Sequence, residues 1–340
     1  MPGSRALNVA VVGATGVVGQ ELFKVLEQRD FPIGRLKALA SERSAGLEVR
    51  CGNHLVPVEP LGEDSFRGVD LALFSAGADI SLMYSPVAVE AGALVIDNSS
   101  AWRLRENVPL VVPEVNAEDV RQSEGIVANP NCCAIPLTVV LEPLRRGAGL
   151  ARVHVSTYQS ASGAGRALVQ ELEDQTRAIA EGRRPEATVY PHQLAYNVVP
   201  GGWSVEPEGY NEEEMKLAHE TRKILHEPHL RIAATCVRVP VPTCHAESVF
   251  VDTERMLTAE EARTLLGAAP GVIVEDDPAA KLYPTPAHVA GKDEVYVGRV
   301  RNDLSGSRGL ALWLVSDNLR KGAALNAIQV AECGREMGII

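Results

Sequence analysis

A glycine-rich turn between an apolar run and a helical segment constrains the fold of this chain more than any other feature. Residues 7–12 are mostly apolar and rich in valine, as in a buried parallel strand, and residues 20–27 have helical spacing. Gly13, Gly16 and Gly19 lie between them in a G-x-x-G-x-x-G pattern. In this context backbone amides and a helix N-terminus hold a pyrophosphate, and glycine permits its close approach. We therefore predict a nucleotide-binding loop at this turn.

Further strand-like runs follow the turn. They lie at residues 36–40, 69–74 and 93–97, with a helical segment between the last two. Strands that alternate with helices form right-handed βαβ units. We therefore predict a doubly wound α/β domain over residues 1–131.

The pattern changes from residue 151. Five segments alternate apolar and polar residues, as strands do when one side faces solvent or a ligand: 153–159, 232–241, 248–251, 295–300 and 310–315. Two segments between them, 167–181 and 212–225, have helical spacing. This layout predicts an α+β domain with a largely antiparallel sheet and helices on one face.

The last segment, 319–337, also has helical spacing, and we expect it to pack back on the first domain. The sequence therefore predicts a first domain made of residues 1–131 with 317–340, and a second domain of residues 132–316. The length of 340 residues also favours two domains.

The composition excludes several classes of partner. The net charge is -11, which argues against nucleic acid or an anionic membrane as the main partner. No apolar run approaches the roughly 20 residues needed to span a bilayer. The 6 cysteines are scattered without a C-x-x-C pair, so we expect a reduced, cytoplasmic protein. His226 and His229 do not have HExxH spacing, and we predict no metal site.

The end of the second strand bears on the choice between NAD and NADP. An acidic residue there would bind the adenosine ribose hydroxyls. The chain instead has Ser41, Arg43 and Ser44, with Glu42 among them. A guanidinium binds phosphate in a bidentate fashion, so these residues favour NADP and its 2′-phosphate over NAD.

Cys132 is the candidate nucleophile. It follows Asn129-Pro130-Asn131, a turn signal, and precedes a segment that predicts a helix start at Ala134. A cysteine near a helix N-terminus has its thiolate stabilised, and His245 is the best candidate for a neighbouring acid–base group. The alternative is a buried, inert cysteine and a structural histidine. We expect Cys133 to be a small core residue.

Several ordered motifs resemble those of the aspartate-β-semialdehyde dehydrogenase family. They are the NPNC motif at residues 129–132, STYQSASGAG at 156–165, EEMK at 213–216, RVPV at 238–241 and SDNLRKGAA at 316–324. The resemblance covers nearly the whole chain. It implies a Rossmann-type NADP domain followed by an α+β substrate and dimerisation domain. It also implies a homodimer, sometimes a tetramer, with the second domain at the interface.

The resemblance implies the reductive dephosphorylation of L-aspartyl-4-phosphate to aspartate semialdehyde by NADPH, through a cysteine thioester and with release of phosphate. That step feeds the synthesis of lysine, threonine, methionine and diaminopimelate.

The family roles are carried over onto matching residues. Cys132 matches the nucleophile, His245 the acid–base and Gln159 the residue that orients the acyl intermediate. The substrate carries a carboxylate, an ammonium and a phosphate. Arg238 matches the residue that binds the carboxylate and Glu213 the one that binds the ammonium, while Arg103 and Lys216 match the phosphate-binding residues. The other matched cofactor positions are Thr15, Gly16, Val17, Val18, Arg43, Ser44, Ser162, Gly163 and Asn318.

Three positions depart from the family pattern. Cys133 stands where Ser or Thr is usual, Cys244 and Ala246 flank the histidine in place of Gly and Ser, and Leu47 replaces a lysine in the cofactor loop. N-acetyl-γ-glutamyl-phosphate reductase is an alternative, although that enzyme typically has His-Pro-Gly-Cys at the nucleophile. A catalytically silent paralogue that acts as a binding partner is a second alternative. A third alternative is a thiol redox protein that uses Cys132 and Cys133, although this chain lacks the C-x-x-C spacing of such proteins.

Overall fold

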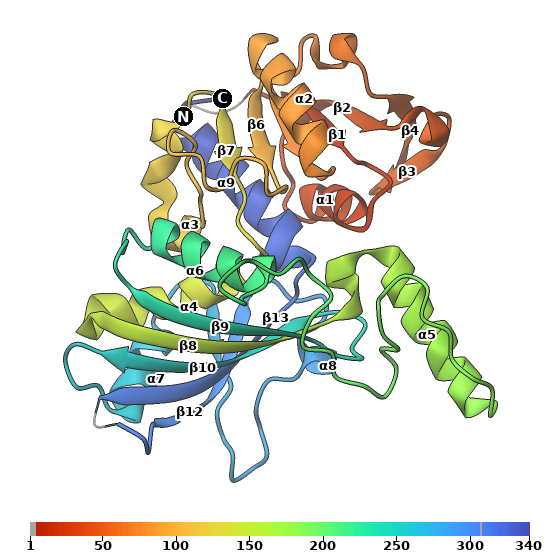
Figure 1. Cartoon of the computed structure of the whole chain (residues 1–340). Helices are drawn as coiled ribbons and strands as arrows, with labels where there is room; N and C mark the ends of the chain where they lie inside the picture. The colour runs from red at the N-terminus through yellow and green to blue at the C-terminus, as the bar shows by residue number, and fades with distance from the viewer. Residues whose placement is uncertain (1–4, 307) are drawn as a thin grey trace. The chain divides into compact units, whose positions relative to one another are not determined.

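The computed structural model describes residues 5–306 and 308–340, which form two compact units (Figure 1). Unit 1 consists of the residues up to Asn131 together with Ala323–Ile340, and unit 2 of Cys132–Gly322. The C-terminal segment thus joins unit 1 from Ala323 rather than from residue 317. Residues 317–322 belong to unit 2 because they are tied to it: Arg320 bonds to Asp293, and Gly322 packs against Cys132.

Unit 1 contains a seven-stranded sheet flanked by helices. Its strands are β1 (Leu7–Val12), β2 (Ile33–Ala40), β3 (Glu48–Cys51), β4 (His54–Pro60), β5 (Leu71–Phe74), β6 (Leu94–Asp97) and β7 (Ile126–Ala128). Its α-helices are α1 (Val17–Gln28), α2 (Ala78–Glu90), α3 (Pro113–Asn116) and α9 (Leu325–Glu336), and its 3₁₀ helices are η1 (Glu42–Ser44), η2 (Glu63–Phe66) and η3 (Ala117–Gln122).

The order of these strands is β3-β4-β2-β1-β5-β6-β7, and every pair except β3–β4 is parallel. The chain moves outward from β1 in both directions, which confirms the predicted doubly wound domain. The sequence reading missed the β3–β4 hairpin and the short strand β7. A π-helical turn, Arg320–Ala324, precedes α9, so the final helix begins later than the predicted residue 319.

Both faces of this sheet are buried, because alternate residues of β1 belong to different cores. Leu7, Val9 and Val11 pack in a cluster with α1 and α9. Ala10 and Val12 pack in a second cluster that includes Ala88 of α2. A strand buried on both faces needs a near-continuous apolar run, which is the pattern seen in the sequence of β1.

Unit 2 contains a six-stranded mixed sheet. Its strands are β8 (Leu150–Gln159), β9 (Arg231–Arg238), β10 (His245–Thr253), β11 (Val272–Val274), β12 (Val295–Asn302) and β13 (Gly309–Ser316). Its helices are α4 (Ala134–Ala148), α5 (Arg166–Ala180), α6 (Glu212–Ile224), α7 (Ala259–Gly267), α8 (Pro286–Val289) and the 3₁₀ helix η4 (Ala161–Ala164). The order is β11-β12-β13-β10-β8-β9, with only β8–β9 and β11–β12 parallel, which confirms the predicted largely antiparallel sheet.

The two faces of this sheet differ. Helices α4 and α6 lie along one face, where α6 packs on β9 and α4 on β10, β12 and β13 (Figure 1). In β8 the residues Val153, Val155 and Gln159 point to that helix-covered face and are buried. Arg152, His154 and Tyr158 alternate with them and are exposed on the other face. We call the first the inner face and the second the open face.

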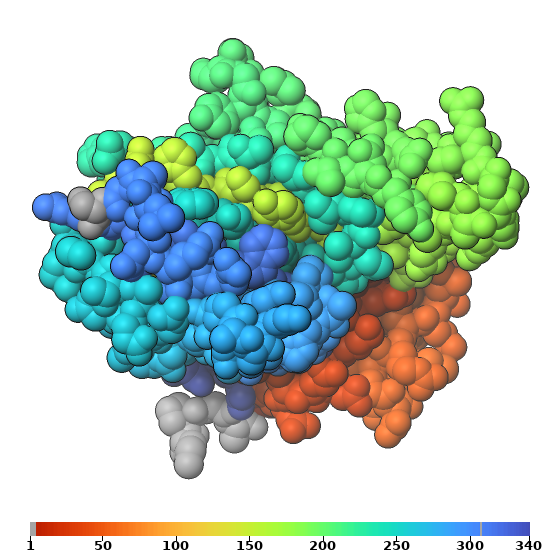
Figure 2. All heavy atoms as spheres, turned by 90° about the horizontal axis from the view of Figure 1, so that it is seen from below, coloured from red at the N-terminus to blue at the C-terminus, as the bar shows by residue number. Residues whose placement is uncertain are grey.

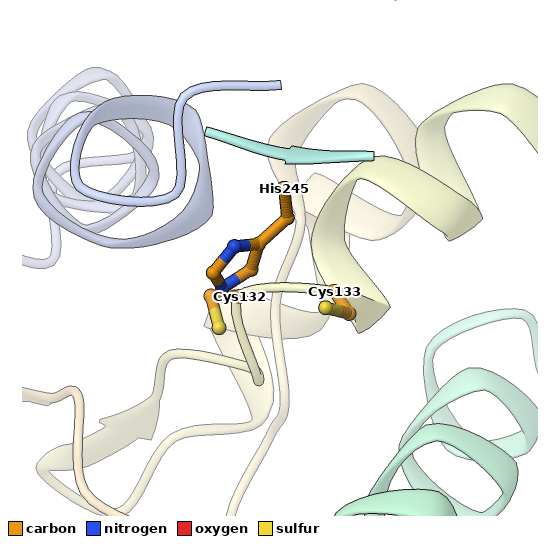
Figure 3. A group of neighbouring side chains, drawn as sticks. All are labelled: Cys132, Cys133 and His245. Atoms are coloured by element: carbon orange, nitrogen blue, oxygen red, sulfur yellow. The ribbon is translucent and has the colours of Figure 1, made fainter. Parts of the chain in front are cut away.

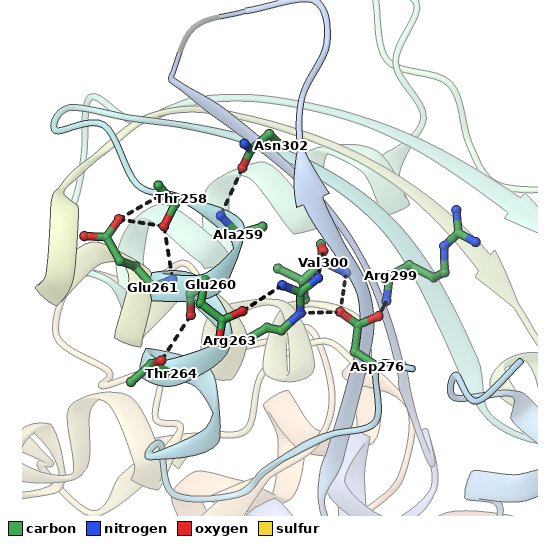
Figure 4. Close-up of polar contacts among 10 residues, drawn as sticks. All are labelled: Thr258, Ala259, Glu260, Glu261, Arg263, Thr264, Asp276, Arg299, Val300 and Asn302. Atoms are coloured by element: carbon green, nitrogen blue, oxygen red, sulfur yellow. Dashed lines mark hydrogen bonds and ion pairs between the residues drawn. The ribbon is translucent and has the colours of Figure 1, made fainter. Parts of the chain in front are cut away.

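Asp276 secures the edge of this sheet (Figure 4). β12 has a bulge between Gly298 and Arg301, at which Arg299 has a positive φ of 55°. The buried Asp276 carboxylate accepts hydrogen bonds from the backbone N–H groups of Arg299 (2.6 Å) and Val300 (3.1 Å) and from Arg263 Nε of α7 (2.8 Å). These bonds satisfy the backbone donors that the bulge releases and tie α7 to the sheet.

None of the helices in residues 5–306 and 308–340 is long and apolar enough to span a membrane.

Candidate active site

Cys132 lies where the chain enters unit 2, next to the helix α4. Cys133 is the N-cap residue of α4, which begins at Ala134 as the sequence predicts. Cys132 is partly exposed, whereas Cys133 is buried. A Cβ on Gly322 would lie 3.2 Å from Cys132 Cβ, so glycine at that position lets the backbone approach the thiol. Cys132 is therefore held at a helix start, next to the backbone of Gly322.

His245 faces Cys132 from the first position of β10 (Figure 3). Its Nδ1 accepts a hydrogen bond from the backbone N–H of Ser160 at 3.0 Å. Because Nδ1 is an acceptor, the proton of the neutral ring is assigned to Nε2. Nε2 is buried without a hydrogen-bond partner among the described residues and points toward the sulfur of Cys132. His245 is thus oriented to donate a proton next to the sulfur of Cys132.

The surroundings of Cys132 favour its thiolate. A hydrogen bond from the Cys133 side chain is the largest cause that lowers the pKa of Cys132 well below its usual value; desolvation opposes this, and His245 lowers the pKa further. Burial, together with the neighbouring Cys132 and Glu247, raises the pKa of Cys133 well above its usual value. The surroundings of the two adjacent thiols therefore favour the thiolate at Cys132 and the protonated thiol at Cys133.

Gln159, Glu213 and Lys216 form a bonded group beside this centre. Gln159 Nε2 donates to Glu213 Oε1 at 3.2 Å and to Thr157 Oγ1 at 3.3 Å. Lys216 Nζ lies 3.5 Å from Glu213 Oε2, three residues along α6. Glu213 is only 6% exposed, so Gln159 and Lys216 together compensate its buried charge.

Arg238, at the end of β9, lies next to the same centre. It pairs with Gln159 across the parallel strands, and its Nη1 donates to the carbonyl of Ser160 at 2.8 Å. A Cβ on Gly163 would lie 2.9 Å from Arg238 Nη1 and 3.0 Å from His245 Nε2. The backbone at Gly163 thus fits between the arginine and the histidine because it carries no side chain.

Asn318 and Ser162 belong to a hydrogen-bond network behind His245. Asn318 Oδ1 accepts from the backbone N–H of Cys244 at 2.9 Å and from the hydroxyls of Ser160 and Ser162, each at 3.1 Å. The network joins η4, the loop before β10 and the segment after β13. It fixes Ser160, and through Ser160 the imidazole ring.

A second polar layer lies one step deeper on the inner face. Thr157 of β8 pairs with Cys236 of β9 and with Glu247 of β10. Glu247 is fully buried, and neither of its carboxylate oxygens has a hydrogen-bond partner among the described residues. Burial is the main cause that raises its pKa well above the usual value, and the nearby Cys132 adds to it. The folded environment of Glu247 therefore favours the neutral carboxylic acid over the carboxylate.

The glycine-rich turn lies in unit 1 between β1 and α1. Gly13 has a positive φ of 83°, and a Cβ there would collide with the carbonyl oxygen of Ser75, just after β5. A Cβ on Gly19 would collide with the carbonyl of Gly13. Gly16 is the N-cap of α1 and provides no side-chain cap. The turn lies where the strand order diverges from β1, the usual place for a nucleotide in such sheets.

The other nucleotide candidates of unit 1 lie around this turn and at the end of β2. Thr15, Val17 and Val18 follow in the turn and the first residues of α1. Ser41 is the N-cap of the 3₁₀ helix that contains Arg43 and Ser44. The Ser41 and Arg43 side chains are exposed, as a site for an incoming phosphate requires.

Arg103 also lies in unit 1 and is 8% exposed. Its Nε donates to the carbonyl of Asn129 at 2.9 Å and its Nη2 to that of Asn98 at 2.7 Å. Two backbone carbonyls thus fix the guanidinium next to the segment that leads to Cys132.

The expectation that the chain holds no metal stays a prediction. Ligand atoms of Cys132, Cys133 and His245 all lie within 4.8 Å of one another (Figure 3). Thiolates and imidazole suit a soft metal ion, and the same donors suit thiol catalysis.

Four residues of this centre were not among those predicted from the sequence: Ser160, Glu247, and Tyr190 and Trp203, whose ring centres lie 5.8 and 4.9 Å from the guanidinium carbon of Arg238. Ser160 stands directly after Gln159, inside a motif that the sequence analysis had already singled out. Trp203 is one of only 3 tryptophans, which was the one signal available for it. Nothing in the sequence pattern distinguished Glu247, because its burial results from the packing of α4 on the sheet.

Comparisons with known proteins agree with this two-unit arrangement. A family model described as "Semialdehyde dehydrogenase, NAD binding domain" matches residues 8–123, and one described as "Semialdehyde dehydrogenase, dimerisation domain" matches residues 141–321. The chain is therefore a semialdehyde dehydrogenase with a nucleotide-binding and a dimerisation domain.

Curated relatives narrow this class. The chain is 48% identical over 344 residues to an aspartate-semialdehyde dehydrogenase of Bacillus subtilis, with 99% of each chain covered. It is 49% identical over 337 residues to the Aquifex aeolicus enzyme of that name, with 98% of this chain and 99% of the relative covered. The crystal structure of aspartate semialdehyde dehydrogenase II from Vibrio cholerae has a TM-score of 0.95 at 43% identity, covering 98% of this chain and 99% of that one. The chain belongs to the aspartate-semialdehyde dehydrogenase family, which confirms the resemblance.

Proposed function

We propose that this protein converts L-aspartyl-4-phosphate to L-aspartate 4-semialdehyde with NADPH, through a thioester on Cys132, and so supplies lysine, threonine, methionine and diaminopimelate synthesis. The observation that carries the proposal is the arrangement of Cys132 and His245. Cys133 and His245 stabilise the thiolate, and His245 has a free Nε2 aimed at it. A crystal structure of the Vibrio cholerae relative is described as a complex with ASA.

In the first step the Cys132 thiolate attacks the carbonyl carbon of the acyl phosphate. The new C–S bond forms as the C–O bond to phosphate breaks, and inorganic phosphate leaves. The leaving group carries negative charge, and Arg103 and Lys216 are the proposed phosphate-binding residues. The product of this half-reaction is a neutral thioester on Cys132.

In the second half-reaction the thioester is reduced. NADPH, when bound, supplies the hydride. His245 Nε2 donates its proton to the oxygen of the resulting hemithioacetal and takes a proton back as that intermediate collapses. The C–S bond then breaks, the aldehyde forms, and Cys132 returns as the thiolate that its surroundings stabilise.

The charged groups around Cys132 suit the three charges of the substrate. We propose that Arg238 binds the α-carboxylate and Glu213 the ammonium group, while Gln159 orients the acyl group. Arg238 Nε is buried without a partner among the described residues, which leaves one donor available. An unpaired buried donor is costly, so a substrate oxygen that accepts from it gains affinity.

The nucleotide-binding turn fits a dinucleotide. The N-terminus of α1 has no side-chain cap, and its free N–H groups suit a pyrophosphate. We propose that Gly13, Gly16 and Gly19 hold this group and that Arg43, with Ser41 and Ser44, favours NADP over NAD. Ser162, Gly163 and Asn318 are the proposed cofactor residues of unit 2.

We further propose that the protein is a homodimer assembled through the open face of the unit 2 sheet. Tyr158 and Phe250 on that face are 37% and 40% exposed, and the Tyr158 ring lies 5.3 Å from the Trp313 ring. Figure 2 shows the yellow-green residues of β8 at the surface of unit 2, beside teal and blue segments of the same unit. Aromatic residues are enriched at the centres of such interfaces. A tetramer, and a cytoplasmic location, stay predictions from the sequence.

The test uses the reverse reaction, followed by the absorbance of NADPH. Purified, reduced protein is mixed with aspartate semialdehyde and NADP, with and without inorganic phosphate. We expect NADPH to form only with phosphate, because phosphate must cleave the thioester to regenerate Cys132. A rate that does not depend on phosphate contradicts the acyl-phosphate chemistry. Turnover only with the N-acetylated glutamate analogue would assign the other reductase, and binding without any turnover would assign a silent paralogue.

A further inference from the structure

Arg238 is surrounded by aromatic rings as well as by the residues of the active site. Its guanidinium carbon lies 4.9 Å from the ring centre of Trp203 and 5.8 Å from that of Tyr190. The arginine is 2% exposed, and its Nη1 already donates to Ser160. Both ring distances lie within the range in which a guanidinium is attracted to the face of an aromatic ring.

The two rings come from one irregular segment, which the sheet edge holds in place. Val199 in this segment forms an antiparallel bridge with Arg238, in which Val199 N–H donates at 3.0 Å and Arg238 N–H donates back at 2.8 Å. The Tyr190 hydroxyl donates to the carbonyl of Gly201. Gly202 has a positive φ of 96°, and a Cβ there would collide with the Tyr190 hydroxyl. The backbone thus brings both rings to the end of β9.

Helix α5 fixes the other side of this segment. Glu171 accepts hydrogen bonds from the backbone N–H groups of Thr188 and Val189, each at 2.6 Å. Gln175 Oε1 accepts from those of Leu194 (2.9 Å) and Ala195 (3.0 Å). Two side chains of α5 thus bind four backbone donors of a segment without regular secondary structure, which makes it a fixed support rather than a loose loop.

We propose that Tyr190 and Trp203 form an aromatic clamp that holds the Arg238 guanidinium in the orientation needed to bind a substrate carboxylate. The proposal rests on the proposed function, in which Arg238 binds that carboxylate. The two rings lie beside the guanidinium, and Nε is buried without a hydrogen-bond partner among the described residues, so Nε is the donor at which a carboxylate can bind in the guanidinium plane. Tyr190 and Trp203 are positioning residues, because they act through Arg238.

The physical reason for the clamp is pre-organisation. An arginine side chain has many rotamers, and fixing it at the moment of binding costs affinity. The two rings, the Ser160 carbonyl and the strand fix Arg238 before the substrate arrives. The aromatic faces also attract the charge and exclude water from it, which strengthens its interaction with a carboxylate.

The test is a comparison of KM and kcat in three variants, measured with aspartate semialdehyde, NADP and phosphate. Trp203→Leu should raise KM for aspartate semialdehyde about ten-fold, with a smaller fall in kcat, because the loss is in binding. Trp203→Phe keeps an aromatic face and should recover most of the wild-type KM. Tyr196→Leu is the matched control: Tyr196 lies on the same segment but is 75% exposed, and its KM should be unchanged.

Arg238→Ala separates the failure of the clamp from the failure of the proposed function. If Arg238→Ala leaves KM unchanged, the assigned role of Arg238 is wrong. If Arg238→Ala raises KM but Trp203→Leu does not, Arg238 binds the substrate and the clamp is wrong. An equal rise of KM in Trp203→Phe and Trp203→Leu also contradicts the clamp.

A fluorescence measurement keeps the test valid if Trp203→Leu folds poorly. Titration of the wild-type protein with aspartate semialdehyde should change tryptophan emission, because the carboxylate binds next to the Trp203 ring. Trp203→Phe should lose most of that change while it retains turnover. An emission change that persists in Trp203→Phe overturns the placement of Trp203 at the carboxylate.

Discussion

The inner and open faces of the unit 2 sheet are built from the same strands but carry different residues. Successive residues of β10 point to opposite faces. His245 and Glu247 point to the inner face, whereas Ser248 and Phe250 point to the open face. The inner positions are buried, while Phe250 is 40% exposed. One strand therefore supplies both the proposed acid–base residue His245 and part of the proposed subunit interface.

This difference shows how a two-residue repeat separates two tasks. On the inner face, the hydrogen bond from Cys133 and the neighbouring His245 lower the pKa of Cys132 against the effect of burial, whereas burial raises the pKa of Glu247. On the open face no such shift is needed, and exposed aromatic rings suit a contact with a second subunit. Substitutions on one face should therefore affect chemistry, and those on the other assembly.

The largest expected effect is on the inner face. Cys132→Ala removes the nucleophile and should lower kcat on the order of 10³-fold or more. Binding of NADPH should remain, because the nucleotide turn lies in unit 1. Steady-state turnover and a titration of NADPH fluorescence measure the two quantities. Retained turnover contradicts the assignment of Cys132.

Substitutions on the open face should change the oligomeric state of the protein. Phe250→Asp places a charge among aromatic rings and should weaken the dimer about 100-fold, converting it to monomer at micromolar concentration. Size-exclusion chromatography with light scattering reports the mass. Leu304→Asp is the control, because Leu304 is fully exposed on the turn before β13. A Phe250→Asp protein that stays dimeric removes the open face as the interface.

A smaller change is expected for the neighbour of the nucleophile. Cys133→Ala removes the hydrogen bond that lowers the pKa of Cys132, so that pKa should rise. The acid limb of the pH profile of kcat/KM should then move to higher pH by about one unit, given the usual strength of a hydrogen bond to a charged group. Cys133→Ser keeps a donor and should restore the profile. Identical pH profiles of kcat/KM for Cys133→Ala and the wild-type protein would show that Cys133 is only a core residue.

The smallest effect concerns Glu247 and is seen in stability. The folded state raises the pKa of this carboxyl above its ordinary value of 4.5. The folded protein therefore holds a proton that the unfolded chain loses above that pH, and stability falls as pH rises from there toward the folded pKa. Glu247→Gln is always neutral and should gain thermal stability over the wild type at pH 8 but not at pH 4. Melting curves at both values decide this, and a gain of equal size at both argues that burial of a titrating group is not the cause.

The sequence predicted the fold where all parts of a structural pattern lie within one short stretch of the chain. The run at β1, the glycines after it and the helical spacing of α1 lie within one short stretch, so the doubly wound unit followed from them. The β3–β4 hairpin was missed because its strands are short and half exposed, which gives a weak alternation. The start of α9 was placed too early because residues 320–324 form a π-helical turn with similar spacing.

The candidate site was readable only in part. Cys132, His245, Gln159 and Arg238 came from ordered motifs, and the structure brings these four together in unit 2. The hydrogen bond from Gln159 to Glu213, the aromatic rings at Arg238 and the buried acid Glu247 did not follow from the sequence. Each depends on a contact between segments that are far apart in the chain.

The sequence by itself determined the class of the protein: a glycine turn after a buried strand, a cysteine at a helix start, and the charged residues that match a small charged substrate. Only the tertiary structure decided what state those groups are in. In the neutral imidazole ring of His245 the proton is assigned to Nε2, because the backbone N–H of Ser160 donates a hydrogen bond to Nδ1. The pKa of Cys132 is lowered and that of Cys133 is raised, although the two thiols are adjacent, because their surroundings differ. Residue types and spacing can be read from a chain, but charge state depends on burial and on neighbours that folding alone brings into contact.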